Sequence, residues 1–387
     1  MLTEATLLIG GDVCPIGRNE AALVAGSPTV FGNILPEVEN ADLTIVNLEC
    51  PLIVKSTAVV KGGPTLAAKA ACVKGLKAGG IDIVNLANNH IMDHGLEGLR
   101  STLSACENAG IATVGAGLRE KDARRLLIRT VNNIRIGILG IAESEYSIAR
   151  NGHAGAYGVD TIDLVHRLRG RKEACDFLVV LLHGGNEHYK FPRPGLLELC
   201  RFIIEEGAHV VICQQSHCVG TYEEYMSGLI VYGQGNLIFD LPIEEPGWHE
   251  GMLVKLIFSS EQRFEYELIP IFQSCGGEPV KRMDSMQSQT FLYDLAKRSR
   301  VLGSKQEVER LWLEFCLAHR NTYMSMALAM GKLLSKLNRN GFVTRLLYRR
   351  GNLRTMGNVI RCESHREVLI RIADSDIDEE RRQGCHG

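Results

Sequence analysis

Up to about residue 235, short runs of apolar residues alternate with segments whose apolar positions recur at helical spacing. Uninterrupted apolar runs are typical of strands that are buried on both faces of a parallel sheet. Strands that alternate with helices in this way predict an α/β fold. We expect the strands at residues 6–10, 43–48, 81–86, 111–114, 134–141, 177–182, 209–212 and 229–232.

Residues 66–78 and 96–109 have helical spacing, and glycine follows each of them, as it often follows a helix. After Asn236 three strand-like runs, 237–239, 252–258 and 264–271, leave no room for helices between them. We interpret these runs as antiparallel strands that complete the sheet or add a second one. From about Ser285 the pattern becomes helical. The chain is therefore divided into an α/β domain, 1–272, and a mainly helical region, 273–387.

The formal net charge of −2 hides an uneven distribution of charge. Residues 273–387 hold 20 Lys and Arg against 13 Asp and Glu, whereas residues 1–272 are net acidic. From Cys316 to Cys362 there are nine basic residues and no acidic one. The two parts are therefore expected to meet different partners.

Leucines are interleaved with the cations of this basic stretch. One interpretation is an amphipathic helical hairpin that turns at Asn340 and Gly341 and whose basic face is simply solvated. The other is a docking surface for an anionic polymer, an acidic membrane surface or nucleic acid. Nucleic acid ranks last, because no aromatic-rich nucleic-acid motif is visible. The residues concerned are Leu333, Leu334, Leu337, Leu346 and Leu347 among Lys332, Lys336, Arg339, Arg345, Arg349 and Arg350.

The twelve cysteines include no Cys-x-x-Cys pair, a pattern that fits reduced thiols in a cytoplasmic protein. The first residues lack the basic and apolar regions of a signal peptide, and no run approaches the roughly 18 apolar residues of a membrane span. We therefore expect neither an export signal nor a transmembrane anchor, and we leave peripheral membrane association open. Residues 374–387 are charged and expected to fray.

Polar residues follow the predicted strands one after another. In an open α/β sheet the ligand crevice lies outside the carboxyl ends of the strands, so these side chains are expected to meet at one edge. The residues are Asp12 after the first strand, Asn47 and Glu49 at the second, Asn89 and His90 after the third, and then His183 and His217.

Carboxylate oxygen, amide oxygen and neutral imidazole are ligands that suit Mn, Fe or Zn. A single histidine is more often structural than a ligand, but the repeated placement at strand ends favours a metal site. Two ions about 3.5–4 Å apart would clamp a phosphoryl group and activate a water molecule.

Six motifs in this order resemble those of the capsule-synthesis (poly-γ-glutamate synthesis) CapA-type proteins, over residues 5–272. The resemblance implies a calcineurin-like metallophosphatase fold, which is a layered α/β/β/α sandwich, followed here by a C-terminal helical extension. The motifs are Gly11-Asp12-Val13 with Arg18, Ala41 to Pro51, Asn85 to Gly95, His183 to Glu187, Val211 to His217, and Ile230 to Asn236 with Phe239-Asp240.

The resemblance also implies roles for individual residues. Asp12 would bind the first metal ion, Glu49 would bridge two ions, and Asn89 would bind the second ion through its amide oxygen. His183 and His217 match the remaining histidine ligands. His90 matches the histidine that protonates the leaving oxygen or stabilises negative charge.

Two positions depart from the pattern of the family. Gln215 stands where the family usually has the first histidine of a His-x-His segment, and Cys14 replaces the histidine of the Asp-x-His of ordinary metallophosphatases. Glutamine binds Zn or Mn more weakly than imidazole does. These departures bear above all on the second metal site.

Several further residues have two interpretations each. Arg18 could clamp an anionic substrate or pair with a surface carboxylate, and Asn236 could contact substrate or form a turn. Asp93 could orient His90 or cap the helix that starts near Leu96. Asn47, Glu187 and Gln215 are placed beside the ligands as supporting residues, and Cys14, Cys50, Cys213 and Cys218 are expected to pack as small apolar groups.

The sequence thus favours a metal-dependent, phosphoesterase-type hydrolase of capsule or exopolymer biosynthesis that acts on an anionic polymer or a phosphorylated substrate. The alternative is a non-catalytic accessory protein that keeps the fold and binds polymer. Gln215 favours the accessory protein, and the other ligand types favour the enzyme.

Overall fold

The computed structural model describes residues 3–170, 174–328, 330–347 and 350–372. The chain forms two compact units, Met1–Trp312 and Leu313–Gly387. The first unit extends beyond residue 272 and includes α8 (Ser285–Ser299), η4 (Arg300–Gly303) and the first half of α9 (Lys305–Ala318). The segment 374–387, which we expected to fray, lies outside the described residues.

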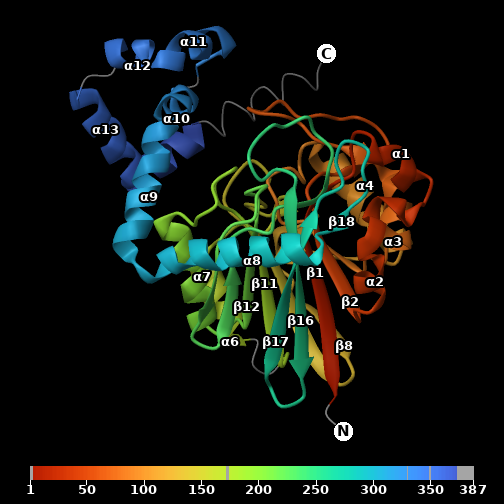
Figure 1. Ribbon diagram of the computed structural model, residues 1–387. Helices are drawn as coiled ribbons and strands as arrows, with labels where there is room; N and C mark the ends of the chain where they lie inside the picture. The colour runs from red at the N-terminus through yellow and green to blue at the C-terminus, as the bar shows by residue number, and fades with distance from the viewer. Residues whose placement is uncertain (1–2, 171–173, 329, 348–349, 373–387) are drawn as a thin grey trace. The chain divides into compact units, whose positions relative to one another are not determined.

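The larger sheet has the strand order β18-β17-β16-β1-β2-β5-β6, with β15 paired to β1 (Figure 1). Strands β1, β2, β5 and β6 run parallel, as predicted, whereas β16, β17 and β18 pair antiparallel. The bounds are β1 Glu4–Cys14, β2 Leu43–Leu48, β5 Ile83–Asn85, β6 Ala112–Val114, β15 Asn236–Phe239, β16 Glu250–Ser259, β17 Phe264–Phe272 and β18 Lys281–Arg282.

The second sheet has the order β13-β14-β12-β11-β9-β8, with a parallel centre and antiparallel edge strands. Two small pairs, β3 with β4 and β7 with β10, lie outside both sheets. The bounds are β8 Leu127–Val131, β9 Ile134–Ala142, β11 Phe177–His183, β12 Val210–Gln214, β13 Tyr222–Tyr225, β14 Gly228–Val231, β3 Leu52–Ile53, β4 Ala68–Lys69, β7 Ala116–Gly117 and β10 Gly155–Ala156.

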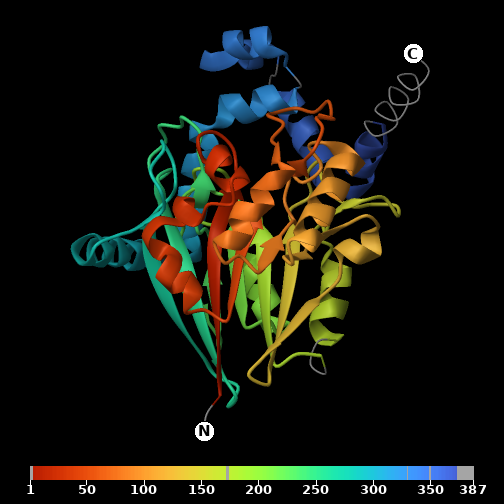
Figure 2. The ribbon, with the colours of Figure 1, turned by 90° about the vertical axis from the view of Figure 1, so that its right-hand side faces the viewer.

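Helices cover the outer face of each sheet. Figure 2 shows α1 to α4 over the larger sheet. In Figure 1, α6 and α7 cover the face of the second sheet that points away from the larger sheet. The bounds are α1 Asn19–Val24, η1 Pro28–Ile34, α2 Leu35–Glu39, η2 Ala70–Cys72, α3 Val73–Ala78, α4 Gly95–Asn108, α5 Glu120–Ala123, α6 Thr161–Gly170 and α7 Pro194–Glu205.

The strands have apolar side chains on both faces, which explains their uninterrupted apolar runs. In β1 and β2, Ile9 and Ile45 belong to the core between the two sheets, whereas Leu8 and Val46 pack toward the helices. A third cluster lies between the second sheet and its helices, and Val180 of β11 contributes to it. The predicted layered α/β/β/α sandwich is thus confirmed.

An irregularity in β1 sets the direction of Asp12, the first residue of the site along the chain. The register of β1 with β2 shifts between Ile9 and Asp12, where Gly10 and Gly11 follow each other. A Cβ on Gly11 would lie 2.0 Å from the carbonyl oxygen of Gly235, so only glycine fits this close approach of two backbones. Such bulges redirect side chains next to functional sites, and here the bulge precedes Asp12.

Two predictions about secondary structure need correction. The segment 237–239 corresponds to β15, which pairs parallel with β1, not antiparallel. A strand-like run carries no information about direction, and the chain passes from the second sheet to the larger one between β14 and β15. The helix predicted at 66–78 begins only at Ala70, because Ala68 and Lys69 form β4.

The second unit is helical, as predicted. It contains the end of α9, then α10 (Arg320–Ala327), α11 (Lys332–Leu337), η5 (Asn338–Asn340), α12 (Phe342–Leu347) and α13 (Arg350–Arg361). The chain turns at Gly341, whose φ is +69°, at the predicted position. Among the described residues no helix is long and apolar enough to span a bilayer.

Candidate metal centre

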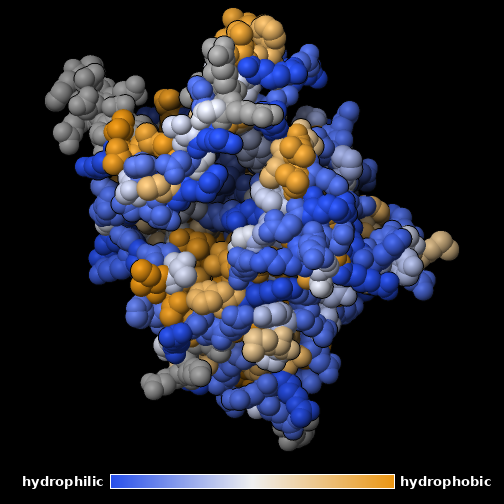
Figure 3. Space-filling view, turned by 90° about the vertical axis from the view of Figure 1, so that its left-hand side faces the viewer, coloured by the Kyte–Doolittle hydropathy of each residue, from blue (hydrophilic) through white to orange (hydrophobic). Residues whose placement is uncertain are grey.

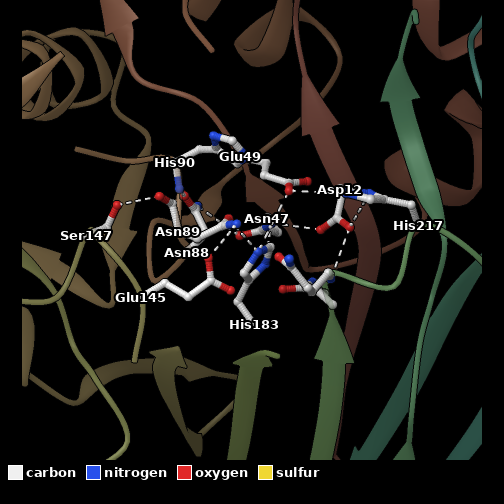
Figure 4. Close-up of polar contacts among 12 residues, drawn as sticks. Asp12, Asn47, Glu49, Asn88, Asn89, His90, Glu145, Ser147, His183 and His217 are labelled. Atoms are coloured by element: carbon white, nitrogen blue, oxygen red, sulfur yellow. Dashed lines mark hydrogen bonds and ion pairs between the residues drawn. The ribbon is translucent and has the colours of Figure 1, made fainter. Parts of the chain in front are cut away.

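Side chains from strands of both sheets converge at one edge of the sandwich (Figure 4). The residues come from the ends of five strands, and each is at most 9% exposed. They are Asp12 of β1, Asn47 and Glu49 of β2 and the loop after it, Asn89 and His90 after β5, His183 of β11, and His217 after β12.

Asp12, Glu49 and His217 form the tightest group. Each offers one ligand atom, and these atoms lie within 4.8 Å of one another. His217 Nδ1 is 3.5 Å from Asp12 Oδ2, and His217 Nε2 is 3.6 Å from Glu49 Oε1. Two carboxylates and an imidazole at this spacing could hold a divalent metal ion.

His183 and Asn89 lie on the other side of Glu49. His183 Nε2 is 3.8 Å from Glu49 Oε1 and 3.2 Å from Asn89 Oδ1. Glu49 therefore stands between His217 and His183, as a bridging carboxylate would.

The environment of Glu49 provides a test of whether a cation fits. Both carboxylate oxygens are buried, and neither has a hydrogen-bond partner in the described part of the chain. Burial, together with the negative charges of Asp12, Glu187 and Glu145, raises the pKa of Glu49 well above its usual range, although His217 acts in the opposite direction. A buried carboxylate without partners is costly unless a charge compensates it, so the donor set fits a divalent cation.

The pKa values of the other ligands are shifted in different directions. Burial alone would lower the pKa of His217, but Glu49 and Asp12 outweigh it and raise the pKa to about 10. The pKa of His183 falls to about 4, mainly because of burial. Burial would raise the pKa of Asp12, but the hydrogen bond from His217 and the charges of both histidines lower it on balance. His183 is thus neutral at pH 7, the form that binds metal ions.

Amide side chains hold these groups in place. Asn47 Nδ2 donates to Asp12 Oδ1 at 2.7 Å and lies 3.2 Å from His183 Nδ1. Asn236 Oδ1 lies 3.0 Å from His217 Nδ1. Behind them Asn85 Nδ2 donates to Asn47 Oδ1 at 3.3 Å. This network fixes the orientation of the ligands, as supporting hydrogen bonds do in metal sites.

His90 belongs to a separate chain of charged groups. Its Nδ1 is 2.7 Å from Asp93 Oδ2, and Lys61 forms an ion pair with the same carboxylate. The first turn of α4 follows His94, not Asp93, so the capping interpretation of Asp93 is wrong and the orienting one agrees with the contact.

Gln215 lies in the site, but in an unusual backbone conformation. Its φ is +101°, and its N–H donates to Asp12 Oδ2 at 3.3 Å. The side-chain oxygen is buried and has no hydrogen-bond partner among the described residues. A non-glycine residue at such a φ costs about 1–3 kcal/mol, and such strain is concentrated at functional sites.

Two of the predicted residues lie farther out. The side chain of Arg18 is 66% exposed, and its Nε lies 3.6 Å from Oδ2 of Asp240, which is a buried carboxylate and not the surface one of that interpretation. Glu187 is exposed and acts on the site through its charge, which helps to raise the pKa values of Glu49 and Glu145. A role of either residue toward substrate or ligand stays a prediction.

The sequence did not single out Glu145, Ser147 and Lys61. Asn89 Nδ2 donates to Glu145 Oε2 at 3.3 Å, and Ser147 Oγ donates to the Asn89 carbonyl at 2.6 Å. Both residues follow β9, so the same strand-end argument would have found them. Lys61 lies between β3 and β4 in a segment without regular structure, where no pattern in the sequence points to it.

The four cysteines beside the site are buried, in agreement with packing as small groups. Burial raises the pKa of Cys14 and, to about 11, that of Cys218, which keeps both thiols protonated. Cys213 Sγ lies 3.5 Å from Cys200 Sγ. Protonated thiols are poor metal ligands.

A family model described as "Bacterial capsule synthesis protein PGA_cap" matches residues 6–241, which include every strand end of this site. The chain belongs to this family. The predicted relationship to CapA-type proteins is thereby confirmed.

Two relatives carry capsule-related names. The chain is 29% identical to the capsule biosynthesis protein CapA of Bacillus anthracis, over 61% of this chain and 60% of that protein. It is 27% identical to the PGA biosynthesis protein CapA of Bacillus subtilis (strain 168), over 71% of this chain and 73% of that protein. The first match spans less than two thirds of the relative.

A solved structure of 5'-nucleotidase from Candida albicans SC5314 superposes with a TM-score of 0.40 and 9% identity, over 82% of this chain and 58% of that one. This likeness is too weak to assign a fold family or an activity.

Proposed function

We propose that the protein is a metal-dependent hydrolase of the phosphoesterase type that acts in the synthesis of a capsule polymer of the poly-γ-glutamate type. The observation that carries the proposal is the buried carboxylate of Glu49, which lies between His217, His183 and Asp12 and has no hydrogen-bond partner among the described residues. Membership in the capsule-synthesis family supplies the biological context. The proposed substrate is an anionic polymer or a phosphorylated intermediate.

In this proposal Asp12, Glu49 and His217 would hold one metal ion, and Glu49, Asn89 and His183 would hold a second. Oxygen and imidazole donors of this kind suit Mn, Fe or Zn. When bound, such an ion acts as a Lewis acid toward a substrate oxygen and lowers the pKa of water.

The residues around the ions divide the remaining tasks. Asp93 accepts the Nδ1 proton of His90, so the ring presents Nε2 to the leaving oxygen as a proton donor. Lys61 balances the charge of Asp93. Asn236 holds His217 and is a proposed substrate contact, and Arg18 is a proposed contact for an anionic substrate at the rim.

Removal of metal provides the test. We expect the purified chain to hydrolyse p-nitrophenyl phosphate or its diester, to lose this activity after dialysis against a chelator, and to regain it with Mn²⁺, Fe²⁺ or Zn²⁺. Metal content measured by mass spectrometry should fall and recover in parallel. A protein that holds no stoichiometric metal and hydrolyses at the same rate after chelation would contradict the proposal.

A second candidate is a polymer-binding accessory protein without turnover. Gln215 favours it, because an amide stands where the family usually has an imidazole. This candidate predicts that poly-γ-glutamate binds the chain whereas none of the phosphoesters is hydrolysed with any metal. Under either candidate function, the location of the protein, in the cytoplasm or peripherally at a membrane, rests on the sequence and stays a prediction.

The variant Gln215→His tests the second metal ion of the proposed hydrolase. The backbone N–H of Gln215 donates to Asp12 Oδ2, and its buried side-chain oxygen has no hydrogen-bond partner among the described residues, so an imidazole at this position would add a stronger metal ligand to the site. We expect the affinity for the more weakly held ion to rise about 10-fold, a change of the size that neighbouring ligand substitutions produce. Calorimetric titration with Mn²⁺ measures it, with Gln215→Asn as the control. Unchanged affinity and stoichiometry would argue against a second ion at this place.

A further inference from the structure

The C-terminal unit places polar side chains inside and large apolar side chains outside. Asn338 and Thr344 are buried, with 0% and 2% exposure, and Ser325 is 8% exposed. Asn338 Nδ2 donates to Ser325 Oγ at 2.9 Å and to Thr344 Oγ1 at 2.7 Å, and the Thr344 N–H donates to Asn338 Oδ1 at 2.9 Å. This polar hub joins α10 to η5 and α12.

The α11–α12 hairpin, residues 331–347, carries the exposed apolar groups. Leu333, Leu337, Phe342 and Leu346 are each between 59% and 74% exposed. Figure 3 shows hydrophobic side chains gathered on the α11–α12 hairpin itself, beside hydrophilic ones. The hairpin that the sequence predicted therefore exposes leucines together with its basic face, and contiguous exposure of this kind marks an interaction surface.

Cations surround these apolar side chains. Lys336, Arg339 and Arg345 are exposed on the same hairpin, and no acidic residue occurs between Cys316 and Cys362. Arg345 donates to the Asn340 carbonyl, which places its guanidinium at the turn. The surface is thus both apolar and positively charged.

A hollow of about 400 Å³ opens on this unit. Lys336 and Arg339 line it together with the polar groups of Asn321, Ser325 and Asn338. Lys336 and Arg339 provide the donors that a phosphate-containing headgroup accepts, because the amide of Asn338 and the hydroxyl of Ser325 are already hydrogen-bonded within the unit.

We propose that the α11–α12 hairpin binds the surface of a membrane that contains anionic lipid. The apolar side chains would enter the boundary between headgroups and acyl chains, while the cations remain at headgroup level. An anionic polymer or a nucleic acid would pair with the cations but would leave four large apolar side chains in water. The hairpin lies outside the metal centre, so this inference does not depend on the proposed hydrolase activity.

Vesicle co-sedimentation of the full chain tests the proposal. We expect binding to vesicles of phosphatidylcholine with phosphatidylglycerol in a 3:1 ratio, weaker binding at high salt because screening weakens the attraction, and no binding to phosphatidylcholine alone. The variant Phe342→Trp should show a blue-shifted fluorescence increment over the parent protein on the anionic vesicles only, which locates the insertion at the hairpin.

Two triple variants separate the contributions of the cations and of the apolar side chains to vesicle binding. Lys336→Gln with Arg339→Gln and Arg345→Gln should weaken binding on the order of 100-fold, since each cation near an anionic surface contributes about a fivefold factor. Leu333→Gln with Leu337→Gln and Leu346→Gln should also weaken it by at least about 10-fold. The matched control changes three exposed apolar residues elsewhere, Val54, Ile162 and Met226, to Gln, and should bind as the parent does.

Several results would overturn the proposal. One is full retention of vesicle binding by the leucine variant, which would leave attraction through the cations alone. Another is binding to RNA or poly-γ-glutamate without any to anionic vesicles. A third is self-association that the leucine variant abolishes without vesicle binding, because the apolar face would then join two copies of the chain. Metal content and hydrolysis should be unchanged in all of these variants.

Discussion

Glu49→Gln is expected to abolish metal binding and, at the same time, to make the metal-free protein more stable. Both oxygens of Glu49 are buried, have no hydrogen-bond partner in the part of the chain that the structure describes, and lie beside Asp12. Without a cation the ionised carboxylate destabilises the fold, whereas glutamine has nearly the same shape and no charge. Neutralising this group should raise the free energy of unfolding by about 1–3 kcal/mol at pH 8.

The pH dependence follows from the raised pKa of Glu49. A carboxyl group whose pKa is higher in the folded state destabilises that state as the pH rises above the ordinary Glu pKa of about 4.3. The advantage of Glu49→Gln should therefore be present at pH 8 and should narrow as the pH falls toward 4. Urea unfolding with a chelator present, at several pH values, measures it.

The metal affinity of Glu49→Gln should fall, although the stability of the metal-free protein rises. Loss even of residues that only support metal ligands costs about 10–100-fold in affinity, so loss of the shared carboxylate should cost at least about 100-fold. The stabilisation of the parent protein by added Mn²⁺ should disappear in the variant. Glu261→Gln is the matched control, because Glu261 is an exposed glutamate in the turn between β16 and β17 and takes no part in the site. Normal metal binding by Glu49→Gln would refute the central role given to Glu49.

His90→Ala is expected to lower the turnover of phosphoesters by about 10²- to 10⁴-fold, the usual contribution of a positioned proton donor. The metal content should not change, because His90 bonds Asp93 rather than the metal ligands. Steady-state kinetics and metal analysis on the same preparation give both numbers. His166→Ala, at an exposed histidine of α6, is the control and should leave both unchanged.

Asp93→Asn and Lys61→Met extend this test to the residues behind His90. Each should lower turnover by about 10-fold, since each weakens the ion pair and hydrogen bond that orient His90 while leaving its ring present. Parent-like turnover of His90→Ala with bound metal would remove His90 from the mechanism. Loss of metal from the same variant would make it a ligand instead.

Much of the α/β unit can be predicted from the sequence because its strands are buried on both faces. Ile9 and Leu8 pack on opposite sides of β1, so the strand appears as an uninterrupted apolar run that ends at Gly10, Gly11 and Asp12. The residues of the site are likewise visible, because each follows such a run. Their convergence requires only that the strands be parallel and that the two sheets pack face to face.

The tertiary structure alone determined the remaining features. The parallel pairing of β15 with β1 and the contact of Lys61 with Asp93 depend on where distant segments meet, and no local pattern records that. The exposure of Leu333 and Leu346 also depends on the tertiary structure, because Asn338 and Thr344 occupy the interior of the hairpin in their place. The sequence by itself determined which elements form and which groups stand at their ends, because those depend on local periodicity and polarity. Which atoms lie within bonding distance was decided by packing, because a contact depends on two surfaces and the sequence describes each one separately.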